Sequence, residues 1–175
     1  QAHQADVVRQ HVETLRRLKY RPTGGFTAFA LADPAPGATA ALVDEARRPK
    51  PALTALREAC APVVAVVVRL PVQLGVGRTV TLAAHVVNDR RAATGELRLL
   101  VTATWSGPVD PAGQPLVVGT TRVGWAGSVA ADDVAAVGAI VLTPPDHASR
   151  LDLTVGLHEG AEVLGERTIV RAVLP

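Results

Sequence analysis

The sequence predicts a mainly β protein, with an immunoglobulin-like antiparallel β-sandwich over residues 61–175 and a helix–strand–helix segment before it, over residues 1–60. From Ala61 onward the chain contains Val- and Thr-rich runs of strand length, separated by clusters of Gly, Pro and Asp. Along Leu151–Leu157 every second residue is apolar, as in a strand with one buried face. Hydrophobic residues make up 48% of the chain and charged residues 19%, a composition that excludes intrinsic disorder.

The first element is an amphipathic helix over residues 1 to about 21. Val8, Val12, Leu15 and Leu18 recur close to the helical period, with polar residues between them. We expect the helix to end near Arg21-Pro22, because the residue before a proline is disfavoured in the helical region.

A strand and a second helix complete the first sixty residues. Phe26–Leu31 is an uninterrupted apolar run of strand length, typical of a strand that is covered on both faces. After the turn-forming segment Asp33–Gly37, Pro49 and Pro51 open a helix in which Leu53, Leu56 and Cys60 share one face. We interpret Cys60 as a small core residue of that face rather than a nucleophile.

The sandwich is predicted from eight strand-like runs. They are Val63–Leu70, Thr79–Val87, Gly95–Trp105, Pro115–Trp125, Ser128–Ala131, Ala136–Leu142, Leu151–Leu157 and Ala161–Val173. His158-Glu159-Gly160 separates the last two and predicts a hairpin turn.

Composition and spacing exclude several function classes. The net charge of +2 is too small to predict a nucleic-acid partner, and the apolar run Ala61–Val68 is too short to predict a membrane span. The five histidines show no ligand spacing, so we expect neither a metal nor a cofactor. The single cysteine excludes an internal disulfide and leaves the compartment open.

Two pairs of carboxylates are candidates for the acid and base of a sugar-cleaving site. Asp132 and Asp133 are adjacent in sequence and would point to opposite faces of an extended segment. Glu159 and Glu162 flank a predicted hairpin tip, where solvated charges are common. We interpret all four as ordinary surface charges.

Residues Glu13–Val63 contain a series of short motifs in a fixed order. They are Glu13 with Leu15-Arg16-Arg17, then Phe29-Ala30-Leu31-Ala32-Asp33, Ala35-Pro36, Thr39-Ala40, Asp44, Lys50 and Pro62-Val63. The series resembles the end of the catalytic barrel in glycoside hydrolase family 2, most closely its β-mannosidase-like members, whose last barrel strand carries Trp-Gln-Leu-Asn-Asp. The resemblance implies that residues 1–60 are the last helix, strand and helix of a (β/α)8 TIM barrel and that residues 61–175 are the sandwich after it.

The departures from the family pattern affect its sugar-binding positions. Phe29 stands where the resemblance implies a tryptophan of the sugar-binding floor, and it keeps an apolar face without the indole donor. The family's strand Gln and Asn correspond to Ala30 and Ala32 here. The tryptophans of its following Trp-Pro and Ser-Trp motifs correspond to Ala35 and Ala40. Asp33 is retained, either as a polar contact at the barrel mouth or as a turn-forming residue before Pro34. The candidate substrate-binding residues are therefore Phe29 and Asp33, and no catalytic residue is assigned.

These observations favour a non-catalytic C-terminal piece of a longer, family-2-like glycoside hydrolase acting on β-linked sugars. The resemblance implies that the two catalytic glutamates precede Gln1 in the parent protein. The alternative is a degenerate carbohydrate-binding or assembly module; a plain adhesion-type sandwich is disfavoured by the unbroken motif spacing. We expect residues 1–60 to bind the N-terminal remainder of the same protein or a second copy, with carbohydrate as a further possible ligand.

Overall fold

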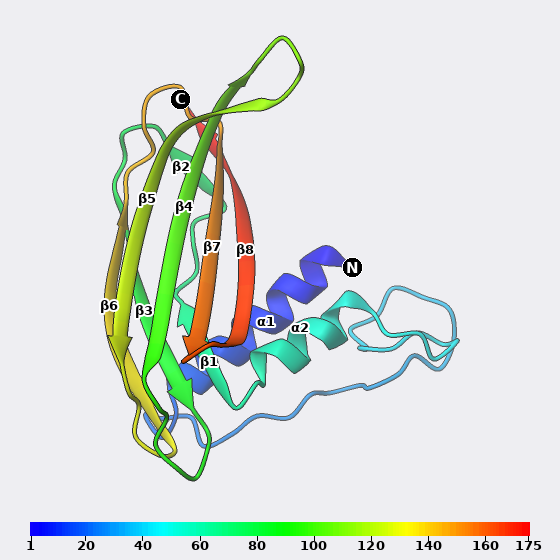
Figure 1. The fold of residues 1–175 in the computed structure, drawn as a ribbon. Coiled ribbons are helices and arrows are strands. Elements are labelled where there is room, and N and C mark those ends of the chain that lie inside the picture. The colour runs from blue at the N-terminus through cyan, green and yellow to red at the C-terminus, as the bar shows by residue number, and fades with distance from the viewer.

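Two β-sheets of unequal size face each other and form a sandwich in the computed structural model, which describes residues 1–175 (Figure 1). The smaller sheet has the order β1-β3-β6, with β1 at Val63–Val67, β3 at Val80–Asn88 and β6 at Asp133–Leu142. The larger sheet has the order β2-β8-β7-β4-β5. Its strands are β2 (Gln73–Gly75), β4 (Leu97–Val109), β5 (Pro115–Gly127), β7 (Arg150–Glu159) and β8 (Glu162–Leu174). The expected mainly β protein with two sheets is confirmed.

Alternation of apolar and polar residues creates the core. In β4, the residues from Leu97 to Trp105 at odd positions are buried, whereas Arg98 and Leu100 face solvent. In β7, Leu151 and Leu153 are fully buried in the same way. This inward face packs against buried Leu82, Ala84, Val86, Ile140 and Leu142 of the smaller sheet. Because few aromatic residues are present, branched aliphatic side chains fill most of the interior.

The strand predictions were largely correct, with two differences. Ser128–Ala131 forms no strand, because Val129 pairs with the chain near Thr94 instead of joining a sheet; its amide donates to Thr94 Oγ1 and its carbonyl accepts from the Thr94 amide. The short strand β2 was not predicted. It pairs in parallel with the end of β8, at Gln73↔Ala172 and the two pairs that follow.

Both helices form, but the first ends at Arg17, before the predicted end near Arg21-Pro22, and the strand predicted between the helices does not form. The helices are α1 (Ala2–Arg17) and α2 (Pro51–Ala59). Phe26–Leu31 is irregular and exposed, so the helix–strand–helix expectation is wrong for the chain as the structure describes it. An apolar run becomes a strand only where another strand satisfies its backbone groups. Here the segment between the helices has only isolated bridges, at Lys19↔Thr23, Ala32↔Val43 and Val43↔Pro49.

The second helix buries a different face from the predicted one. Ala52, Ala55 and Ala59 are buried, and Cys60 just after the helix is exposed, so its assignment to the core is wrong. The spacing of the alanines is the same as that predicted for Leu53, Leu56 and Cys60, displaced by one residue. Small side chains let the two helices approach closely, which explains why the alanine face was selected.

The helix pair is attached at one edge of the sandwich (Figure 1). Arg16 of α1 donates to the carbonyl oxygens of Ala59 and Ala61, where α2 leads into β1. The Arg167 guanidinium of β8 donates to Glu13 Oε1 of α1 at 2.5 Å, and this ion pair is largely buried. The first sixty residues are therefore tied to both sheets.

Replacing a core leucine should test the position of the core. Leu153→Ala should lower the free energy of unfolding by about 2–5 kcal/mol, because it removes buried methyl groups and leaves a cavity. Leu100→Ala on the outer face of β4, where the side chain is 47% exposed, is the matched control and should cost roughly 1 kcal/mol or less. Urea denaturation measures the free energy of unfolding of both variants. Equal decreases for the two would contradict the assignment of the inward and outward faces of the sheet.

Candidate functional site

The candidate site is built on residues 18–50, the irregular segment between the helices. Four large apolar side chains of this segment face solvent: Tyr20, Phe26, Phe29 and Leu31, with exposed fractions of 65%, 40%, 93% and 67%. Single exposed apolar residues are common on protein surfaces, but four within twelve positions of one segment are a concentrated apolar surface. We call these four residues the apolar segment.

Asp33 lies at the opposite extreme of burial, with a side chain 1% exposed. Its Oδ2 accepts from Lys50 Nζ at 2.5 Å, and its Oδ1 accepts from the Thr39 hydroxyl. The hydrogen bond from Lys50, followed by that from Thr39, holds the pKa of Asp33 below its usual value. The ion pair fixes the middle of the segment relative to the start of α2. It thereby holds the backbone in place where a neighbouring strand would otherwise do so.

The two predicted substrate-binding residues are therefore not brought together in one cavity. Phe29 is free to contact another molecule, whereas both oxygens of Asp33 are committed to protein donors. A role for either residue in substrate binding stays a prediction.

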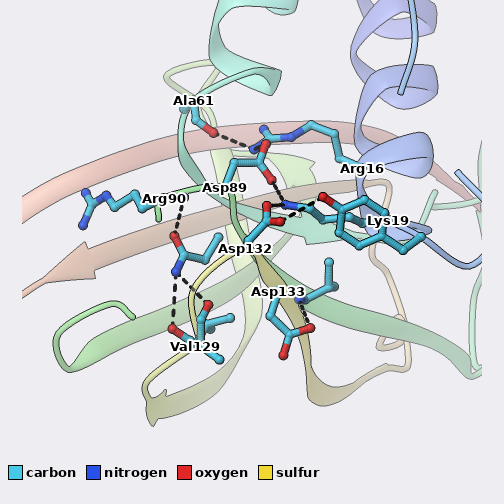
Figure 2. Close-up of polar contacts among 12 residues, drawn as sticks. Arg16, Lys19, Ala61, Asp89, Arg90, Val129, Asp132 and Asp133 are labelled. Carbon is cyan, nitrogen blue, oxygen red and sulfur yellow. Dashed lines mark hydrogen bonds and ion pairs between the residues drawn. The ribbon is translucent and has the colours of Figure 1, made fainter. Parts of the chain in front are cut away.

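A second polar centre lies where α1 ends against the sandwich (Figure 2). We call Arg16, Lys19, Tyr20, Asp89 and Asp132 the aspartate cluster. Arg16 Nη2 donates to Asp89 Oδ2 at 2.7 Å, and Lys19 Nζ donates to Asp89 Oδ1 at 2.6 Å. Lys19 also donates to Asp132, whose other oxygen accepts from the Tyr20 hydroxyl at 2.8 Å. One lysine thus bridges two loops of the sandwich.

Buried Asn88 at the end of β3 positions the loops that carry the two aspartates. Its side-chain amide donates to the carbonyl oxygens of Ala92, Val129 and Ala130, and its oxygen accepts from the Arg90 amide (Figure 2). Ala92 lies in the loop after β3, whereas Val129 and Ala130 lie in the loop before β6. The Asn88 side chain therefore holds both loops. Asp89 follows Asn88 directly, so its direction is set by the same network.

The pKa shifts in the aspartate cluster indicate that its ion pairs stabilise the attachment of α1 to the sandwich. Hydrogen bonds from Lys19 and Tyr20 hold the pKa of Asp132 below its usual value. Burial alone would lower the pKa of Lys19, but its hydrogen bonds with Asp132 and Asp89 outweigh this and raise it. General acid–base catalysis near neutral pH requires a group with a pKa near the working pH, and these shifts move both groups away from it.

Sequence reasoning considered Asp132 and Asp133 together and did not identify the cluster. The structure separates them: Asp132 bonds to residues of the first helix and its end, while Asp133 Oδ1 accepts from the Val134 amide at 2.7 Å. Asp89 was missed, although a polar Asn88-Asp89 step at the end of an apolar strand is a detectable signal. Glu159 accepts from Arg90 at 2.6 Å, so it too is in an ion pair rather than simply solvated.

The structure contains no group of three or more His, Cys, Asp or Glu residues arranged to hold a metal ion. Neither helix has the length and hydropathy needed to cross a membrane.

Comparison with solved structures identifies the kind of protein in which this fold occurs. The chain matches part of a β-D-mannosidase from Dictyoglomus thermophilum with a TM-score of 0.69 and 13% identity, covering 96% of this chain and 18% of that one. It matches the exo-chitosanase of Amycolatopsis orientalis with a TM-score of 0.70 and 15% identity, covering 97% and 18%. Both matches include the helix pair as well as the sandwich. No family model and no curated protein matches the sequence.

The aspartate cluster predicts an acid-sensitive fold. Because the pKa of Asp132 is lower in the folded state, the cluster adds stability above pH 3.8, the ordinary aspartate value, and loses it as the pH falls further. Asp132→Asn should therefore lower the unfolding free energy at neutral pH and have a smaller effect at about pH 2.5, because the wild type loses the stabilisation by the carboxylate as the pH falls below 3.8.

Asp133→Asn is the matched control for this experiment, since it removes the same charge one position away without touching Lys19 or Tyr20. Urea denaturation at the two pH values gives the comparison. A loss of stability for Asp132→Asn that is the same at both pH values would contradict the electrostatic role of the carboxylate.

Proposed function

We propose that this chain is the non-catalytic C-terminal region of a family-2-like glycoside hydrolase that acts on β-linked sugars, with a β-mannosidase-like parent. The observation that carries the proposal is the match of 96–97% of the chain, as one piece, to a β-mannosidase and an exo-chitosanase. A simple sandwich protein would share only the sandwich. The motif series of residues 13–63 independently points to the same enzyme family.

In this proposal, residues 1–60 close a TIM barrel and residues 61–175 form an immunoglobulin-like domain beside it. The apolar segment supports the division, since Phe26 is exposed in the isolated chain and would be covered by neighbouring elements of a barrel. The irregular backbone of Phe26–Leu31 would then become a strand upon pairing, with Phe29 facing the substrate and Asp33 fixing the strand end through Lys50.

Catalysis is assigned to two glutamates of the parent's preceding region, because the carboxylates described above already hold the fold together. Asp33, Asp89, Asp132 and Glu159 each accept from a basic side chain. A retaining glycosidase requires two carboxyl groups about 5 Å apart that are free to act on one bond.

The alternative is a degenerate carbohydrate-binding or assembly module. It is supported by the alanines that replace the polar and aromatic positions of the family motif. Tyr20, Phe26 and Phe29 present exposed aromatic faces on which a sugar ring could stack. A parent sequence without the two strand-end glutamates would favour this alternative.

The purified chain should not hydrolyse 4-nitrophenyl β-mannoside, β-galactoside or β-glucuronide above the buffer rate. Release of 4-nitrophenolate measures this, with Asp33→Asn and Glu159→Gln as variants. Turnover that disappears in either variant would overturn the non-catalytic assignment. If the chain is inactive, addition of the separately expressed N-terminal region should restore hydrolysis; failure to do so with a correctly associated complex favours the degenerate module.

The apolar segment should make the chain associate. Leaving a few hundred Å² of apolar surface exposed forfeits several kcal/mol at about 25 cal/mol per Å². Light scattering should therefore report a species larger than 18.2 kDa, and Phe26→Ser with Phe29→Ser should shift it toward the monomer.

Leu116→Ser with Val117→Ser is the matched control, because these side chains are 50% and 62% exposed at the distant β4–β5 hairpin. This double variant should leave the association unchanged. A strictly monomeric wild-type chain at micromolar concentration would show that residues 1–60 need no partner.

A further inference from the structure

A basic groove lies at the open edge of the sandwich. Strand β1 has five residues and β8 has thirteen, so the smaller sheet cannot cover the whole inward face of β8. In β7, Leu151, Leu153 and Val155 are buried on the inward face of the sheet. Their partners in β8 are Arg171, Ile169 and Arg167, so these three side chains lie on the same inward face. Helix α1 and residues 66–72 form the other walls, and the cavity between them has a volume of about 580 Å³.

Positive charge dominates this groove. Five arginines but only two acidic residues line it, which is a larger excess than the net charge of +2 on the entire chain. Two of the arginines are neutralised, Arg9 by Glu58 and Arg167 by Glu13. Arg17, Arg69 and Arg171 have no carboxylate within 4 Å. They come from α1, from the chain after β1 and from β8, so the fold gathers them from three distant segments.

Arg171 carries an unsatisfied donor inside the groove. Its Nη1 donates to the Val170 carbonyl oxygen at 2.7 Å, but its Nε is enclosed by protein and has no acceptor. A buried donor without a partner is uncommon, because leaving it unsatisfied costs its desolvation free energy. An oxyanion bound in the groove beside Arg171 would neutralise this guanidinium, which no carboxylate of the protein does.

The groove already holds one carboxylate of the protein itself. Glu13 reaches into it from α1 and accepts from Arg167 at 2.5 Å. Burial raises the pKa of Glu13, while its attraction to Arg167 opposes the shift. The positive potential of the region is also felt by His85 on β3, whose pKa is lowered by burial and by Arg17.

The remaining walls combine apolar side chains with the polar residues His3, Asp6, Gln10 and Thr14 of α1, which bears on the size and type of ligand. Val66, Leu70 and Ile169 line the interior, and Val72 and Val170 are 69% and 45% exposed beside it. A groove of several hundred Å³ with apolar walls and a few converging polar groups has the character of a small-molecule site.

We propose that this groove binds a small organic anion, with its carboxylate or sulfate group held by Arg69 and Arg171 and its less polar body against Val72 and Ile169. Arginine suits this task because its planar guanidinium donates two parallel hydrogen bonds to one oxyanion. The anion could be the acid group of a sugar or of a non-sugar metabolite, since both present the same chemistry. The site is separate from Phe29 and Asp33 and does not depend on the proposed function.

The test is a calorimetric titration of the full chain with four probes: 4-nitrophenyl β-D-glucuronide, neutral 4-nitrophenyl β-D-glucoside, 4-nitrobenzoate and inorganic sulfate. We expect the glucuronide to bind at least about tenfold more tightly than the glucoside, because only the former carries an oxyanion. Sulfate should compete with it. Equal binding by 4-nitrobenzoate indicates a general organic-anion site, and weaker binding indicates an acidic sugar. Equal affinity for the glucuronide and the glucoside, or no binding of any anion, would overturn the proposal.

Two variants locate the site. Arg69→Gln and Arg171→Gln should each weaken glucuronide binding by about tenfold, through loss of a charge-assisted hydrogen bond. Arg69 is exposed and makes no hydrogen bond or ion pair within the protein, so its replacement should not disturb folding, which urea denaturation checks. Arg122→Gln is the control, because it removes one charge from the exposed face of β5, away from the groove. Equal weakening by Arg122→Gln would show that binding follows net charge, and the groove assignment would be wrong.

Discussion

The structure depends on the burial of a five-stranded sheet by a three-stranded one. The inward leucines of β4 and β7 must be covered, and β1, β3 and β6 cover them only in part. The uncovered edge beside β8 has to be closed by something else, and the protein closes it with helix α1 and with arginine side chains. The position of the helix pair and the basic groove both follow from this difference in sheet size.

Attachment of the first sixty residues relies on ionic contacts more than on apolar packing. Glu13, Arg16 and Lys19 lie on one helix and its end. Glu13 contacts β8, and Arg16 and Lys19 contact the loops that carry Asp89 and Asp132. Such contacts have strict geometry, so they set the position of the helix while contributing modest stability. Phe26, Phe29 and Leu31 of the apolar segment, in contrast, are exposed, and this exposure is the observation behind the proposed covering partner.

The carboxylates illustrate how the same residue types can serve structure or chemistry. In this chain Asp33, Asp89, Asp132 and Glu159 accept hydrogen bonds from cationic side chains, and the pKa shifts resolved for Asp33, Asp132 and Glu159 all keep the ionised form. Arg17, Arg69 and Arg171 at the sandwich edge, in contrast, have no carboxylate partner. In the proposed function, these arginines and the apolar segment are the groups through which the chain contacts other molecules.

By itself, the sequence determined the strands and helices whose pattern is local. Alternation along Leu151–Leu157, the helical spacing from Val8 to Leu18 and the turn at Gly160 depend on neighbouring residues, so they could be read without a structure. Tertiary structure alone decided that Phe26–Leu31 would be left without a strand partner, that α2 would bury its alanines, and that Lys19 would meet Asp132, 113 positions away. It also brought Arg17, Arg69 and Arg171 into one groove. Periodicity records which face of an element is apolar, but the partner that satisfies a backbone, a charge or a buried donor is chosen only when distant segments meet.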